Sequence, residues 1–496
     1  MKKITWRKHH KWLGLLLGFF IIMFSLSGLI LNHPMLFADV NISRKMLPEV
    51  YQYKQWNNGL LRGSLKWHGQ VLIYGNSGIW ISDTNAASLK DFNRGLPEGA
   101  DFRQIRRVDQ TRSGKLFAAG QYGLYTYTGK EGWKDVKLST LDNEKLSDLY
   151  VKGDSVIAVG RSCLYLSTPP FRSFQQITLR PAGNEDGRVS LFRTIWLLHS
   201  GELFGTIGKL IVDLIAIVFI ILTLTGILFW FVPFIRKKKP VSLLKHLFKW
   251  HNSLGKITIA LTLFLCITGW FLRPPALIAI ASSKVPPMPF TTMDSDNPWH
   301  EKLRTLRYDE TKKDWLLYTS SGFYAMKHLQ DVPKAELHQP TVSVMGINVE
   351  EKDENGQWLI GSFSGMFKWD RRNNIVTDYF TGKISRPVTG MPISDQTISG
   401  YSADFSLNNI VVDYNQGTDR LPMPQWMSSL PMSLRNVCIE VHTGRIYTFI
   451  GKGSIFYIFL MGLAIFWCIW SGWKIRRVKK KKRLNTLRRG LRTEQF

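Results

Sequence analysis

The stretch HKWLGLLLGFFIIMFSLSGLILNHP, residues 10–34, decides the fold of this chain. It is an almost unbroken apolar run, long enough to cross a bilayer as a helix, with His10 at its polar start. Residues 251–275, HNSLGKITIALTLFLCITGWFLRPP, repeat its spacing. The matched positions are His10, Gly14, Gly28 and Pro34 with His251, Gly255, Gly269 and Pro275. This recurrence indicates an internal repeat rather than a single anchor.

A second pair of stretches recurs in the same order. His199 opens HSGELFGTIGK and His442 opens HTGRIYTFIGK, which share the pattern H-x-G-x-[LI]-[FY]-x-x-I-G-K. Each leads into another apolar span, and Trp230 and Trp473 lie at equal distances beyond the two histidines. We therefore expect a two-fold repeat of helix, outer domain and helix, with one histidine at the start of each helix.

Four apolar spans follow from this pattern, at roughly residues 12–31, 204–231, 256–272 and 449–473, each near the length of about 20 residues that crosses a bilayer. The first is too long for a signal peptide, and no A-x-A-like cleavage site follows it. The start, the loop through Lys256 and the tail from Lys474 together carry 23 Lys and Arg but one acidic residue, Glu494. The positive-inside rule then places both termini and this loop in the cytoplasm.

The net charge of +28 is concentrated in those three segments. Topology and attraction to anionic lipids explain it more simply than nucleic-acid binding, so we expect no nucleic-acid partner. The resulting division is residues 1–32 (cytoplasmic start and first span), 33–198 (first segment of the outer β domain), 199–234 (second span), 235–251 (basic cytoplasmic loop), 252–274 (third span), 275–441 (second segment of the outer β domain), 442–473 (fourth span) and 474–496 (basic cytoplasmic tail).

The outer segments consist of short alternating runs joined by glycine-containing turns, as in SLKWHGQVLIYGNSGIWIS, residues 64–82. Such units recur about every 40 residues, the period of a propeller blade. We expect five or six of them, packed into one propeller-like domain that covers their edges; two separate β-rich sandwiches are the alternative. The expected fold is a membrane α-helical four-helix bundle with two extracytoplasmic all-β, propeller-like insertions.

The four histidines at matching positions suggest a cofactor site. A pseudo-two-fold axis along the membrane normal would bring His10 to His251 on the cytoplasmic side and His199 to His442 on the outer side. Two neutral imidazoles on facing helices can supply both axial ligands of a b-type haem, so two haems are expected.

Basic residues near these histidines are the expected partners of the haem propionates. They are Lys209, Lys452, Arg445 and Arg273, for which snorkelling toward lipid headgroups is the alternative. Asp213 lies one turn after Lys209, so an ion pair within the helix is its simplest account. His33 has Pro274 as its counterpart in the repeat and is assigned a plain interfacial position, with a place in the lining of an outer site as the alternative.

Other cofactors are not indicated. There is no G-x-G-x-x-G after a strand and no P-loop, which argues against a nicotinamide, flavin or nucleotide site. There is no C-x-x-C or C-x-x-C-H, which argues against zinc and covalent haem. Cys266 and Cys468 lie in apolar spans, while Cys163 and Cys438 lie in the outer segments, where a disulfide is open.

The helix starts carry a family resemblance. The motifs H-K-W-L-G, L-H-S-G-E-L-F-G…T-G-I-L-F-W and W-H-N-S-L-G-K resemble the PepSY-associated transmembrane family. That family includes bacterial inner-membrane ferric-siderophore reductases that carry haem. The resemblance implies that the four histidines are haem ligands and that electrons pass outward. Typical members carry PepSY modules outside the membrane, whereas these outer segments look blade-like. The resemblance therefore implies the path of the electrons more directly than the identity of the substrate.

The sequence therefore predicts an oxidoreductase of the ferric reductase type. Electrons would come from a quinol or a separate reductase on the cytoplasmic side and pass to a ferric chelate or siderophore in the periplasm. One alternative is a non-enzymatic envelope sensor or scaffold whose propeller-like domain binds a ligand or partner. A small transporter is the other; against it stand the expected absence of broken spans and of midplane acids.

Overall fold

The computed structural model describes residues 2–138, 145–183, 187–235, 241–343, 345–385, 394–407 and 409–493. The chain divides into two compact units. The helical unit joins residues 1–37, 187–294 and 435–496, and the β unit joins residues 38–186 and 295–434. Each unit is thus assembled from both halves of the sequence.

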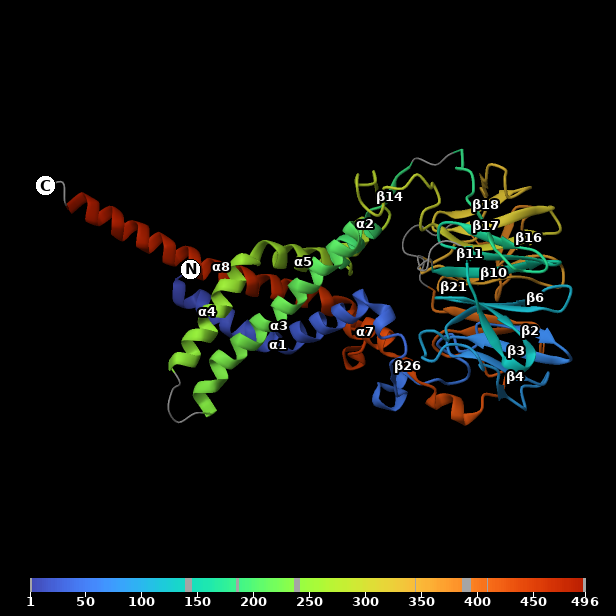
Figure 1. Cartoon of the computed structure of the whole chain (residues 1–496), viewed down its shortest axis with the longest axis horizontal. Coiled ribbons are helices and arrows are strands. Elements are labelled where there is room, and N and C mark those ends of the chain that lie inside the picture. The colour runs from blue at the N-terminus through green and yellow to red at the C-terminus, as the bar shows by residue number, and fades with distance from the viewer. Residues whose placement is uncertain are drawn as a thin grey trace. The chain divides into compact units, whose positions relative to one another are not determined.

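The helical unit contains the apolar spans (Figure 1). Its helices are α1 (Lys3–Asn32), α2 (Leu191–Ser200), α3 (Gly205–Ile235), α4 (Val241–Ile257), α5 (Ile259–Phe271), α6 (Ala276–Ile280), α7 (Leu434–His442) and α8 (Ser454–Thr493). Short 3-10 turns precede or follow them: η1 (Pro34–Leu36), η5 (Glu202–Phe204) and η7 (Thr448–Gly453). The two-residue strands β14 (Val189–Ser190) and β15 (Lys284–Val285) pair antiparallel.

Three described helices are long and apolar enough to cross a membrane, over Lys3–Asn32, Glu202–Pro233 and Phe456–Arg476. The pair α4 and α5 makes a fourth span if it is counted as one, but it is bent by 67°. The prediction that no span is broken is therefore wrong. The bend lies at Thr258, whose hydroxyl donates to the carbonyl oxygen of Leu254 (2.9 Å), a back-bond that commonly bends helices.

Packing in the helical unit follows the small residues of the spans. Helix α1 packs against α3 and α8, and α5 packs against α8 and α2. At Gly18 of α1, an added Cβ would lie 3.0 Å from Ile227 of α3, so the glycine permits close approach of the two helices. Leu16, Ile207 and Leu214 remain exposed, as expected of side chains that face lipid.

The β unit consists of small antiparallel sheets, which confirms that aspect of the predicted fold. Five have four strands: β2 (Gly63–Trp67), β3 (Gln70–Gly75), β4 (Gly78–Ser82), β5 (Lys90–Asp91); β6 (Ile105–Gln110), β7 (Leu116–Gly120), β8 (Leu124–Tyr127), β9 (Trp133–Val136); β10 (Leu146–Lys152), β11 (Ser155–Gly160), β12 (Leu164–Ser167), β13 (Gln175–Ile177); β16 (Leu303–Asp309), β17 (Asp314–Thr319), β18 (Gly322–Met326), β19 (Lys334–Ala335); and β20 (Ile347–Lys352), β21 (Trp358–Ser362), β22 (Gly365–Asp370), β23 (Ile375–Asp378). Two have two strands: β24 (Ile398–Ser402) with β25 (Ile410–Asp413), and β1 (Asn41–Ile42) with β26 (Met432–Ser433).

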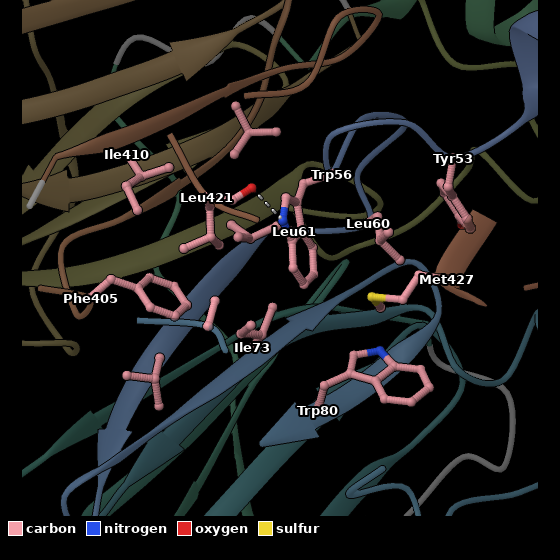
Figure 2. Packing of buried hydrophobic residues seen from close by; sticks show 13 residues of the cluster. Tyr53, Trp56, Leu60, Leu61, Ile73, Trp80, Phe405, Ile410, Leu421 and Met427 are labelled. Atoms are coloured by element: carbon pink, nitrogen blue, oxygen red, sulfur yellow. Dashed lines mark hydrogen bonds between the residues drawn. The ribbon is translucent and has the colours of Figure 1, made fainter. Parts of the chain in front are cut away.

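The two outer segments of the sequence share hydrophobic cores in this unit. One core joins residues 53–86 to residues 405–427, and another joins residues 157–182 to residues 299–329. Figure 2 shows the first, where the indole N–H of Trp56 donates to the carbonyl oxygen of Leu421 (3.2 Å); Phe405 belongs to the same cluster. Neither outer segment buries these side chains by itself.

Charged side chains are also buried between sheets of the β unit. Arg371 is almost fully buried and binds Asp309 (2.6 Å), Asp314 (2.8 Å) and Glu336. Its three carboxylate partners accept from both terminal nitrogens of the fork-shaped guanidinium, so this cluster ties β16, β17 and the end of β22 to the loop after β19.

Candidate functional site

The four repeated histidines lie on four different helices of the helical unit: His10 on α1, His199 on α2, His251 on α4 and His442 on α7. The structure brings them together as two pairs. The ring centres of His10 and His251 are 5.9 Å apart, and those of His199 and His442 are 6.1 Å apart. We call these the inner pair and the outer pair.

The H-x-G motif explains how the outer pair is positioned. Gly201 and Gly444 follow the two histidines and adopt left-handed conformations, with φ of 78° and 73°. Glycine accepts this conformation without a steric penalty and ends a helix there. His199 therefore lies in the last turn of α2, and His442 is the last residue of α7.

In the inner pair, each Nδ1 atom is held by a neighbouring helix. Nδ1 of His10 lies 2.9 Å from the carbonyl oxygen of Cys468 and 3.3 Å from the hydroxyl of Ser471. Nδ1 of His251 lies 3.0 Å from the carbonyl oxygen of Leu222 and 3.1 Å from the hydroxyl of Thr225. Because a carbonyl oxygen only accepts, Nδ1 carries the hydrogen in both rings.

The outer pair repeats this arrangement. Nδ1 of His442 lies 3.1 Å from the carbonyl oxygen of Phe24 and 3.0 Å from the hydroxyl of Ser27. Nδ1 of His199 lies 3.1 Å from the hydroxyl of Thr268. That hydroxyl already donates within its own helix, to the carbonyl oxygens of Phe264 and Leu265, so it accepts from the imidazole.

These contacts select one tautomer. With the hydrogen on Nδ1, each Nε2 keeps its lone pair and is available as a metal ligand. The two Nε2 atoms of a pair would be the residues' ligands to a bound metal ion. Ring-centre separations of 5.9 and 6.1 Å leave room for one such ion between the two imidazoles of a pair.

Each imidazole also packs on a glycine that directly follows the hydroxyl residue. The four dipeptides are Ser27–Gly28, Thr225–Gly226, Thr268–Gly269 and Ser471–Gly472. A Cβ atom at these glycines would lie 3.4 Å from His442, 3.5 Å from His251, 2.7 Å from His199 and 3.0 Å from His10. The dipeptides thus combine an acceptor for Nδ1 with the space in which the ring lies.

The two pairs lie at opposite ends of α1. His10 belongs to the inner pair, and Ser27 contacts the outer pair. At about 1.5 Å per residue, the residues between them span roughly 25 Å of helix, which is close to the hydrocarbon thickness of a bilayer. A cofactor at each pair would lie near each membrane surface.

The basic residues predicted to bind the haem propionates differ in which groups they contact. Lys209 lies 3.8 Å from Glu202, and Arg445 forms a two-pronged pair with Glu440 (2.9 and 2.5 Å). The side chain of Lys452 lies outside the described residues. Arg273 lies within electrostatic range of His442.

The structure also separates the two lysines that the I-G-K motif aligned. Gly205, the first residue of α3, has φ 62° and ψ −145°, and Gly451, before α8, has φ 59° and ψ −137°. These two glycines are therefore equivalent, so the second half has three more residues after its histidine. Lys209 is inside α3, whereas Lys452 precedes α8.

Arg476, which the sequence motifs do not single out, lies within electrostatic range of both imidazoles of the inner pair. It donates to the carbonyl oxygen (2.6 Å) and the side-chain oxygen (3.1 Å) of Asn252, next to His251. A Cβ at Gly255 would lie 3.3 Å from its guanidinium. Within the described residues, no group of three or more His, Cys, Asp or Glu side chains is placed to hold a metal ion.

The predicted ion pair between Asp213 and Lys209 is wrong. Asp213 instead accepts hydrogen bonds from Nε2 of His33 (2.7 Å) and from the amide of Asn32 (2.9 Å). The end of α1 packs beside α3 there and offers two donors, whereas Lys209 turns toward Glu202. His33 is therefore one half of a histidine–carboxylate pair and not a plain interfacial residue.

Comparison with known proteins identifies the family. The sequence profile of the PepSY-associated TM region matches residues 7–479, nearly the whole chain. The chain belongs to the PepSY-associated TM family. It is therefore a membrane protein with several apolar helices, as the sequence motifs predicted.

Other comparisons are more distant. No protein of curated function matches this PepSY-associated TM protein. Solved structures that match include the extracellular domains of a hybrid two-component system and of a one-component system from B. thetaiotaomicron, at 12% and 10% identity with TM-scores of 0.21 and 0.17. The matches cover 74% and 73% of this chain but 48% and 47% of those chains, about half their length.

The Ser/Thr–Gly dipeptides that hold the imidazoles were not predicted, although the sequence contains a signal for them. A Ser/Thr–Gly dipeptide occurs toward the end of each of the four spans, yet the repeat match paired only Gly28 with Gly269. Gly226 and Gly472 are 246 positions apart, while the two outer histidines are 243 apart, so a constant offset misaligns them. The three extra residues before α8 hid the correspondence.

The four cysteines are free thiols, so the disulfide left open between Cys163 and Cys438 is not formed. Cys468 instead contributes its carbonyl oxygen to His10.

A second buried polar cluster lies in the β unit. Arg107 of β6 binds Glu351 of β20 (2.5 Å), and Arg307 of β16 binds Asp148 of β10. Nε of Arg307 also donates to the backbone oxygen of Glu350 (3.2 Å). Burial raises the pKa of Glu350 to about 7, in spite of the neighbouring guanidinium of Arg307.

Proposed function

We propose that this PepSY-associated TM protein binds two b-type haems, one at each histidine pair, and carries electrons across the membrane to reduce a ferric chelate such as a siderophore. The observation that carries the proposal is the repeated geometry of the two pairs. In each, the ring centres lie 5.9 or 6.1 Å apart, and neighbouring helices hold both Nδ1 atoms, which leaves both Nε2 atoms available to a metal ion. Pairs of this kind suit haem, whose macrocycle supplies the other four ligands.

Different residues of the chain would bind the iron, orient its ligands and neutralise the propionates. The four histidines hold the iron through Nε2, and the hydroxyls and carbonyl oxygens at Nδ1 fix their orientation. Arg476 at the inner pair and Arg273 at the outer pair supply positive charge for the haem propionates, in place of the predicted lysines. A haem held at each pair supplies one-electron oxidation and reduction of its iron.

The direction of electron transfer follows from the proposed topology. With both termini and the basic loop in the cytoplasm, the inner pair takes electrons from a quinol or a separate reductase. The outer pair then passes one electron to a ferric chelate, which becomes ferrous. Oxygen ligands hold Fe(II) more weakly than Fe(III), so reduction favours release of the iron.

The arrangement of the units belongs to the proposal. The spans would form a four-helix bundle in a bacterial inner membrane, with the basic segments against anionic lipid and the β unit in the periplasm. The sheets would be blades of one propeller. In support, β2 contacts β6 and β24, β10 contacts β6 and β16, and β20 contacts β24. Such a platform could bind the chelate.

An absorption spectrum of the detergent-purified protein, oxidised and then reduced with dithionite, tests the proposal. We expect the bands of six-coordinate b-type haem and two haems per chain by pyridine haemochrome. His10→Ala and His199→Ala should each remove about half the haem, and the double variant nearly all of it. His9→Ala is the matched control, because His9 adjoins His10 but contacts Trp467 instead of the inner pair.

A protein that stays colourless after expression with ample haem would overturn the proposal. Retention of both haems in His10→Ala or in His199→Ala would refute the assignment of that pair. If ferric chelate does not reoxidise the reduced haem, the proposed reduction of the chelate is refuted, whereas the proposed electron transfer between the two pairs is not.

A further inference from the structure

The pair formed by His33 and Asp213 is a second titratable site in the helical unit. Asp213 lies within the apolar span of α3, and its side chain is 11% exposed. Placing a carboxylate in such a span is costly, so ionisable residues there usually serve a function. Its oxygens accept from His33 (2.7 Å) and Asn32 (2.9 Å), which offset some of that cost.

The repeat shows that the fold does not need this pair. The counterpart of His33 is Pro274, and that of Asp213 is Phe456 by one offset or Phe459 by the other. The second half therefore builds the same kind of helices without either group. A costly acid present in only one half points to a role at one end of the molecule.

One side chain, that of Asn32, links the His33–Asp213 pair to the outer histidine pair. The amide nitrogen of Asn32 donates to Asp213 and also to the carbonyl oxygen of Ser200 (3.2 Å). Ser200 directly follows His199. Among the described residues, the charged group that acts on both histidines of the inner pair is Arg476, and an arginine keeps its proton.

His33 is also open to a proton donor. Its side chain is 36% exposed, and within the described residues of the chain its Nδ1 makes no hydrogen bond. An aspartate that orients one imidazole nitrogen and leaves the other accessible is the arrangement by which proteins exchange protons.

Other charges at this end of α3 do not supply such a site. The charged or titratable groups on the elements packed near Asp213 are Arg193 and His199 of α2, Glu202 of η5, Lys209 of α3 and Arg273 after α5. Lys209 and Glu202 pair with each other, and the arginines stay charged. On α4, His251 contacts Thr225, which lies roughly 18 Å along α3 from Asp213.

We infer that His33 and Asp213 form a proton-binding site that takes up one proton when one electron arrives at the outer histidine pair. The inference rests on the proposed haem function. The electron reduces ferric iron to ferrous iron, and the proton comes from the outer aqueous phase, so the local charge is unchanged. When the electron leaves for the acceptor, the proton returns to water or to the released chelator.

The test is a redox titration of the full-length His10→Ala variant, which isolates the outer site, between pH 5.5 and 8.5. We expect reduction to raise the proton affinity of the pair about tenfold, which shifts the midpoint potential by about 59 mV across the range. His33→Asn and Asp213→Asn should each remove this pH dependence. The inner site, isolated in His199→Ala, is the control and should show little dependence.

Infrared difference spectra of reduction provide a second measurement. A carboxyl or imidazolium signal that appears with the electron should disappear in both variants, and His33→Asn serves if Asp213→Asn does not fold. An outer midpoint that does not change with pH, or a dependence that survives in both variants, would overturn the inference. Absence of haem would instead overturn the proposed function.

Discussion

Adding one methyl group at Gly269 should selectively damage the outer site. The Cβ of Gly269→Ala would lie 2.7 Å from Cε1 of His199 and 3.3 Å from both ring nitrogens. Carbon atoms normally approach to about 3.5–4.0 Å, so the ring must retreat by about 1 Å. That movement is half the length of an iron–nitrogen bond, and it pulls Nδ1 away from Thr268.

The internal repeat provides a matched control. Gly28 occupies the equivalent position against His442, where the added Cβ would lie 3.4 Å away, an ordinary contact. Alanine is a better helix former than glycine by about 1 kcal/mol, so neither variant should weaken its helix. Disturbing the support of a metal ligand typically lowers metal affinity about 10- to 100-fold.

The assay is haem titration of each variant in the His10→Ala background, followed by pyridine haemochrome and absorption spectra. We expect Gly269→Ala to bind haem about 10- to 100-fold more weakly, and Gly28→Ala to bind it as the background does. Equal affinities in the two variants, or a larger loss in Gly28→Ala, would refute the assignment of these glycines to the imidazoles.

Three further predictions concern the inner site and the β unit. At the inner pair, Gly472→Ala (3.0 Å from His10) should lower haem occupancy more than Gly226→Ala (3.5 Å from His251), measured in the His199→Ala background; the reverse order would contradict the geometry. Arg371→Leu should destabilise the β unit by about 3–5 kcal/mol in denaturant unfolding followed by tryptophan fluorescence, because it removes the cation shared by buried Asp309 and the partly buried Asp314 and Glu336; an unchanged midpoint would contradict this. The pKa of Glu350 is about 7 in the folded state and 4.5 when unfolded, so its contribution to the free energy of unfolding is most favourable below pH 4.5 and is lost as the pH rises to 7. The free energy of unfolding of Glu350→Gln should therefore match that of the wild type at pH 4 and exceed it by up to about 3 kcal/mol at pH 8. Parallel profiles of unfolding free energy against pH would refute this.

Much of the helical unit was predictable because its constraints are local. Apolar runs of bilayer length, basic flanking segments and histidines at repeated positions are visible without coordinates. The Gly201 and Gly444 turns also follow from local chemistry, since a glycine two residues after each histidine suits a left-handed helix end. The alternating runs likewise predicted small antiparallel sheets.

Other features depend on contacts between distant residues. The partner of Asp213 is 180 positions away in the sequence, so helix periodicity pointed to Lys209, the nearest cation. The bend at Thr258 lies at the start of a continuous apolar run, and composition alone does not show a change of direction there. The three extra residues before α8 shifted the alignment and concealed two of the four Ser/Thr–Gly dipeptides.

By itself the sequence determined the family, the apolar spans, the repeated histidines and the strand-rich outer segments, because each is encoded by composition or spacing along the chain. Only the tertiary structure decided which groups hold each imidazole, which arginines lie near each pair, and that His33 and Asp213 meet. It also decided that both outer segments share hydrophobic cores. Hydrogen bonds and close packing act over a few ångströms in space, and sequence separation does not measure that distance.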